Sequence, residues 1–146
     1  MPRIALFSLI STLVLALVPA HAEPPHEDCL SQFTRAIEGF PELTHHYRVL
    51  TGPVQGKDVL AFVSKTPAAE VPPDGREEMD RVIRLVDEHL VQPGCGSVPQ
   101  QLYFVYPGGP SYSFLIPELE KLKPMRDHPG LWAANVALRI SRTDAP

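Results

Sequence analysis

The sequence predicts an α+β fold, namely an antiparallel sheet of four or five strands with two helices on one of its faces. Two segments carry apolar residues at the three- and four-residue spacing of helices, and each precedes a pair of short β-rich runs. Turn residues separate the runs within each pair. The expected order is therefore helix, two strands, helix, two strands, and then a C-terminal strand or helix.

The first helix is expected to begin near Glu27 and to end at Gly39, because Pro41 follows. Its apolar residues form one stripe, which predicts a face packed into the core. The stripe consists of Cys29, Leu30, Phe33, Ile37 and Phe40.

Residues 47–51 and 59–63 predict a first pair of strands, joined by the turn-rich residues 52–56. The first run alternates between apolar and polar residues. The second is apolar at every position, which favours a central strand buried on both faces.

A second helix is expected over about residues 76–91, after a loop rich in proline whose Asp74 can cap it. Its buried stripe is Met79, Val82, Ile83, Val86 and Leu90. Opposite charges four residues apart on the other side, as in Asp80 and Arg84, indicate a solvated helix face.

Residues 101–106 and 111–116 predict a hairpin around Gly108-Gly109. With those glycines as a two-residue turn, one face carries Tyr103, Val105, Tyr112 and Phe114 and is expected to lie against the helices. The opposite face ends in Tyr106, Ser111 and Ser113, which we expect to be at least partly exposed. Tyrosines at an exposed apolar patch commonly mark a binding surface, so these three are the candidate binding residues. The alternative is that the hairpin is central in the sheet, or that the C-terminal segment covers its second face.

The segment 131–141 alternates between larger apolar and smaller or polar residues, which favours a last strand with Trp132 buried. A helix fits the same residues nearly as well, and the choice stays open here.

Residues 1–22 have the three parts of a cleavable signal peptide. Arg3 supplies positive charge, residues 4–18 are mostly apolar, and Ala20 and Ala22 are small residues before the expected cut. We expect a mature single domain over 23–146 in the periplasm or outside the cell. The apolar run is shorter than the ~20 residues that span a bilayer, so no stable membrane insertion is expected after cleavage.

The two cysteines, Cys29 and Cys95, predict one disulfide in an oxidising compartment. It would close a loop of about 67 residues and stabilise the fold by ~4 kcal/mol. The alternative is a reactive thiol at Cys95.

The formal charge is −4 for the whole chain, and without a basic cluster this argues against nucleic acid as a partner. The histidines His45 and His46 would point to opposite faces of a strand, so no metal site is expected. Weak metal binding by His45 or His26 stays open. No phosphate-binding loop, nucleophile elbow or Cys-x-x-Cys motif occurs in the sequence, so no cofactor is expected.

These observations favour a non-enzymatic periplasmic or secreted module that binds an envelope or secreted protein partner, or a small ligand. An inhibitor, an immunity-type protein and an envelope accessory protein all fit. The alternative is a small secreted hydrolase or thiol enzyme that uses Cys95 or a histidine.

Overall fold

The computed structural model describes residues 28–66 and 75–144. The predicted signal peptide and its cleavage site lie outside the described residues. The chain folds into an α+β structure with a five-stranded sheet, as the sequence predicts. The N-terminal elements are α1 (Cys29–Glu38), α2 (Pro41–His46), β1 (Tyr47–Val54), β2 (Lys57–Ser64) and α3 (Gly75–His89).

The C-terminal half begins with the hairpin of β3 (Gln101–Val105) and β4 (Ser111–Leu115). Three short helical turns follow: η1 (Ile116–Glu118), α4 (Leu119–Leu122) and η2 (Lys123–Met125). The chain ends in α5 (Pro129–Arg139) and the short strand β5 (Ser141–Thr143).

The strands lie in the order β1-β2-β3-β4-β5, and all neighbours are antiparallel except β2 and β3. The sheet is therefore mixed, and the prediction of a purely antiparallel sheet is wrong at this pairing. The reason is that α3 connects these two strands and returns the chain to the end of the sheet at which β2 begins. β3 therefore starts beside the start of β2 and runs in the same direction.

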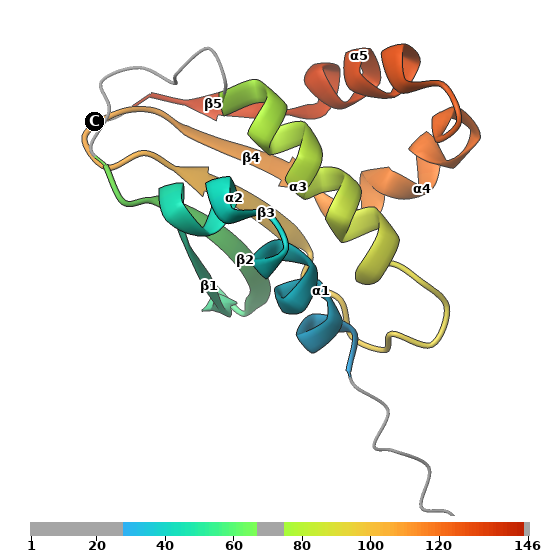
Figure 1. Cartoon of the computed structure of the whole chain (residues 1–146), viewed down its shortest axis with the longest axis horizontal. Coiled ribbons are helices and arrows are strands. Elements are labelled where there is room, and N and C mark those ends of the chain that lie inside the picture. The colour runs from blue at the N-terminus through green and yellow to red at the C-terminus, as the bar shows by residue number, and fades with distance from the viewer. Residues whose placement is uncertain (1–27, 67–74, 145–146) are drawn as a thin grey trace, which may run out of the picture.

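The predicted disulfide is confirmed. Cys29 and Cys95 are bonded, with their Cα atoms 5.4 Å apart. Cys29 begins α1, and Cys95 follows the end of α3, so the bond joins opposite ends of two helices that pack against each other. Figure 1 shows α1 and α3 running in opposite directions in front of the sheet. The Asp28 carboxylate caps α1 by accepting a hydrogen bond from the Ser31 amide at 2.7 Å.

The core forms where alternate strand residues meet the apolar stripe of α3. All five predicted stripe residues of α3 are buried. The sheet contributes Leu60, Phe62, Leu102, Phe104 and Phe114, all fully buried. Residues that alternate with them, such as Ala61, Val63 and Val105, are half-buried, so the two sides of the sheet differ in burial.

The β3–β4 hairpin turns one residue earlier than the sequence suggests. The Gly109 amide donates to the Tyr106 carbonyl at 2.8 Å, and Gly108 has φ +79°. Proline followed by a residue of positive φ is the pattern of a type II turn, which places Pro107 and Gly108 at its centre. One further residue is taken up between this turn and β4, so Val105 pairs with Ser111, and Leu102 with Phe114.

This shift corrects the predicted faces, because a one-residue change of register moves side chains to the opposite face. Tyr106 is 2% exposed and belongs to the core, so the prediction that it is exposed is wrong. Phe114 is buried, as predicted. Tyr103 and Val105 lie on the other face with Ser111 and Ser113, and all four are half-buried.

The favoured strand over 131–141 is also wrong, and the helical alternative is correct. Residues 129–139 form α5, with Pro129 at its first position, where proline is well tolerated. Trp132 is buried as predicted. Three alanines favour the helix over the strand: Ala133, Ala134 and Ala137.

The two adjacent histidines end the helix α2 rather than entering a strand. This helix was not predicted from the sequence, because its six residues are too few to show a helical period. Both His45 and His46 are exposed. Within 28–66 and 75–144, no group of three or more His, Cys, Asp or Glu residues could hold a metal ion.

Candidate functional site

A cleft of about 680 Å³ lies between α3 and α5, above the end of the sheet that carries β5. Its apolar surface comes from both helices and from the sheet. The residues that form it are Met79 of α3, Ala133, Val136, Ala137 and Ile140 in or next to α5, and Tyr112 of β4. The volume falls within the range of ~300–1,000 Å³ that is typical of small-molecule sites.

The sequence builds this cleft because α5 has almost no polar face. Trp132 and Val136 anchor the helix in the core. The small side chains of Ala133 and Ala137 then face α3 without filling the space between the helices. The opposite wall is the side of α3 that the charge pattern assigns to solvent.

Arginines dominate the charged part of the lining. Arg76, Arg81 and Arg84 come from α3 and Arg142 from β5, and no lysine lines the cleft in the part of the chain that the structure describes. The acidic residues Glu77 and Asp80 also line the cleft.

Three of these arginines have carboxylate partners. The Nε atom of Arg84 lies 3.1 Å from Oδ2 of Asp80. Arg81 pairs with Glu42, and Nε of Arg142 lies 2.8 Å from Oδ1 of Asp144.

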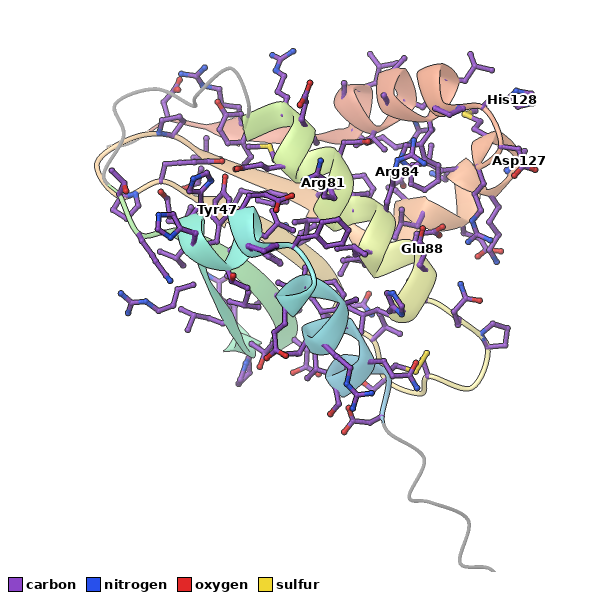
Figure 2. The ribbon with its side chains drawn as sticks, viewed as in Figure 1. Tyr47, Arg81, Arg84, Glu88, Asp127 and His128 are labelled. Atoms are coloured by element: carbon purple, nitrogen blue, oxygen red, sulfur yellow. A yellow bond between two sulfur atoms is a disulfide. The ribbon has the colours of Figure 1, made fainter. Side chains whose placement is uncertain are left out.

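The same three guanidinium groups also lie over aromatic rings. Arg84 lies 5.1 Å from the centroid of the Trp132 ring, and Arg142 lies 6.0 Å from that of Tyr112. Arg81 lies 5.3 Å from the Phe40 ring. Figure 2 shows Arg84 between α3 and α5. A guanidinium that lies over a ring is held by the cation–π attraction, which limits the orientations of the groups around the cleft.

Arg76 differs from the other three. It is exposed, and no ion-pair or hydrogen-bond partner occurs for it among residues 28–66 and 75–144. Of the four lining arginines, it is the one for which the described residues supply no carboxylate partner.

A second polar cluster lies beside the cleft, inside the core. The Tyr47 and Tyr106 hydroxyl oxygens are 2.6 Å apart. Burial, the Tyr106 hydroxyl and a hydrogen bond to Glu78 raise the pKa of Tyr47 far above its usual value. Glu78 also lies 2.6 Å from Nδ1 of His46, which reaches the surface. The Tyr106 ring packs edge-on against Tyr112, which lines the cleft.

The structure does not bring the three predicted binding residues together on a surface. Tyr106 lies in the core, whereas Ser111 and Ser113 lie on the other face of the hairpin. Both serines pair with β5, through Thr143 and Ser141 respectively. None of the three lines the cleft, and they do not form one exposed face of the hairpin.

The residues of the enzyme alternative are also placed by the structure. Cys95 is bonded to Cys29 and has no free thiol. His46 does meet a carboxylate, that of Glu78, but neither residue lines the cleft. His45 is exposed, and His89 ends α3.

Sequence reasoning missed the cleft because it assigned one wall to solvent and the other to a strand. Two signals were present in the sequence. The charged side of α3 carries arginine and no lysine over residues 75–89, and the segment that becomes α5 has few polar residues. Neither signal shows that the two segments, about 50 residues apart, face each other.

No protein-family profile, curated protein or solved structure matches this chain. Among the described residues, none of the helices is both long enough and apolar enough to cross a membrane. The candidate site is accordingly defined by its geometry alone: an apolar cleft between α3 and α5 with arginines along its rim.

Proposed function

We propose that this protein is an exported, non-enzymatic module that binds a small organic ligand in the cleft between α3 and α5. The observation that carries the proposal is the cleft itself, with a volume of about 680 Å³, an apolar surface from Met79, Val136 and Tyr112, and charged groups around it. Small-molecule sites combine an apolar surface with a few placed polar groups in this way.

A binding role fits the lining better than catalysis does. Among the described residues, the cleft is lined by arginine, carboxylate, tyrosine and aliphatic side chains and by no serine, cysteine or histidine. Those three residue types supply the nucleophile and the base in most hydrolases and thiol enzymes. The contact of His46 with Glu78 lies elsewhere, so the hydrolase alternative has less support.

The disulfide supports a location of the protein outside the cytosol. A bond between Cys29 and Cys95 is compatible with an oxidising compartment, and the proposed signal peptide at 1–22 would deliver the chain there. We propose that the protein works in the periplasm or as a secreted protein.

The test is to fill the cleft without changing the rest of α5. The probe is N-phenyl-1-naphthylamine, an uncharged molecule that fluoresces when it enters an apolar site. Ala137 lines the cleft, so Ala137→Trp is expected to abolish saturable binding of the probe. Ala134 is an exposed residue of the same helix outside the lining, so Ala134→Trp is the matched control and should bind normally. Equal binding by the two variants would refute the proposed site.

A further inference from the structure

We infer that the ligand of this cleft is an amphiphilic monocarboxylate whose carboxylate binds Arg76 and whose apolar part lies between α3 and α5. The inference rests on the proposed binding function and adds the chemical class of the ligand.

More basic than acidic residues line the cleft, on a chain that is negative as a whole. Among the described residues, four arginines and two acidic residues line the cleft, and the carboxylates of Glu42 and Asp144 pair with two of those arginines from outside the lining, whereas the formal charge of the chain is −4. No described carboxylate pairs with Arg76, and a cleft with walls of low dielectric concentrates the field of such a charge. The cleft therefore favours an anion over a cation with the same apolar part.

The carboxylate partners of the arginines indicate one anionic group rather than two. Arg84 is satisfied by Asp80, which is itself part of the lining. Arg76 is the one lining arginine for which the described residues supply no carboxylate. A single carboxylate on the ligand would give it the partner that the other three already have.

The pairs of Arg81 and Arg142 do not prevent an anion from binding. Both pairs are solvent-exposed, since the side chains of Arg142 and Asp144 are 59% and 78% exposed, and those of Arg81 and Glu42 are each 40% exposed. Exposed ion pairs of this kind contribute only ~0–1 kcal/mol. Neither pair involves Arg76, so both can stay formed when an anion binds that residue.

The position and the type of Arg76 both suit a carboxylate. Arg76 is the second residue of α3, and the N-terminus of a helix carries a partial positive charge that favours an anion beside it. A guanidinium can also donate two parallel hydrogen bonds to the two oxygens of one carboxylate, which an ammonium group cannot do.

The rest of the lining suits an apolar chain or ring. Met79, Val136 and Ile140 supply aliphatic surface, and Tyr112 supplies an aromatic ring. From Arg76 to Arg84 the wall of α3 extends for about 12 Å, since a helix rises ~1.5 Å per residue. This length accommodates an unbranched acid of moderate size.

The test uses decanoate and 1-decanol as competitors of bound N-phenyl-1-naphthylamine, with the full mature chain at pH 7. Decanoate is expected to displace the probe from the wild-type protein. Arg76→Gln is expected to weaken decanoate about tenfold, the order of a lost charged hydrogen bond. The same variant should change the affinity for decanol less than twofold. Arg48→Gln, at an exposed residue of β1 outside the lining, is the matched control.

Each outcome decides one of the two proposals. If the probe binds and decanol displaces it but decanoate does not, the monocarboxylate inference is wrong and the binding function stands. The inference also fails if Arg76→Gln weakens both competitors equally, or if neither displaces a probe that does bind. If the probe itself does not bind the wild-type protein in the cleft, the proposed function fails.

Discussion

The hydroxyl oxygens of Tyr47 and Tyr106 lie 2.6 Å apart in the core, joining the first strand of the sheet to the residue that follows the third. Both residues are buried, at 4% and 2% exposure. Burial removes water as a hydrogen-bond partner of both hydroxyl groups. The contact between them therefore supplies each hydroxyl with a hydrogen-bond partner.

Tyr106 should therefore be a core residue in stability measurements. Tyr106→Ala is expected to lower the free energy of unfolding by ~3–5 kcal/mol, the range for emptying a large aromatic site. Tyr106→Phe keeps the ring and removes one hydrogen bond, so a loss of ~1 kcal/mol is expected. Urea unfolding of both variants measures these values. Tyr103→Phe, on the other face of the hairpin, is the control and should have almost no effect. An unchanged stability for Tyr106→Ala would contradict the burial of this residue.

Stability should fall in alkaline solution because of the same pair. Burial is the main cause that raises the pKa of both tyrosines in the folded protein above the usual value of 10.0. The unfolded chain then ionises first, so the stability that these groups contribute is complete below pH 10 and is lost as the pH rises above it.

Thermal unfolding followed from pH 8 to pH 11 checks this dependence. Tyr47→Phe removes the group with the larger rise in pKa, and its decline above pH 10 should be shallower than that of the wild type. A variant with the same pH profile as the wild type would show that Tyr47 does not resist ionisation.

The opposite dependence is expected in acid. Lys121 is the main cause that lowers the pKa of Glu118 below 4.5, and Arg139 contributes as well. A carboxyl group with a lowered pKa adds stability above its unfolded pKa, and this stability is lost as the pH falls through the folded value. Glu118→Gln should therefore flatten the loss of stability between pH 5 and pH 2, as followed by circular dichroism. Asp144→Asn, at an exposed pair outside this cluster, is a suitable control.

The register of the hairpin can be tested with two neighbouring residues of β4. Phe114 is buried, and Leu115 is 52% exposed on the opposite face. Phe114→Ala should cost ~3–5 kcal/mol, whereas Leu115→Ala should change stability by less than ~0.5 kcal/mol. Chemical denaturation gives both numbers. A larger loss for Leu115→Ala would reverse the assignment of the two faces.

Loss of the disulfide should destabilise the fold without abolishing the cleft. Replacing both cysteines by serine removes the link between α1 and the end of α3, and a loss of ~2–5 kcal/mol is expected for a small secreted domain. A thiol assay of the unreduced wild-type protein should find no free thiol. Two reactive thiols per chain would contradict the bonded pair and restore Cys95 as a candidate nucleophile.

The sequence by itself determines the elements whose signals are local and strong. The stripes of α1 and α3 repeat at the helical period for several turns, and all five stripe residues of α3 are buried. The two hairpins follow from β-rich runs separated by turn residues. The pairing of Cys29 with Cys95 follows from their number, because two cysteines allow a single bond.

Only the tertiary structure decided the features for which the local sequence is compatible with two conformations of similar energy. The turn at Pro107 and Gly108, one residue before the predicted position, moved Tyr106 from the exposed face into the core, since strand side chains alternate with a period of two. The segment that begins near Leu131 suits a strand or a helix by its pattern, and packing of Trp132 in the core accompanies the helix.

The candidate site is also a feature that only the tertiary structure decided. Its walls come from α3 and α5, which are far apart in the sequence and meet through the sheet and the buried Trp132 and Val136. On an isolated α3, the arginines are indistinguishable from a solvated charged face, because their local pattern is the same in both settings. They line a cleft only because α5 packs across from them, and that contact depends on long-range packing.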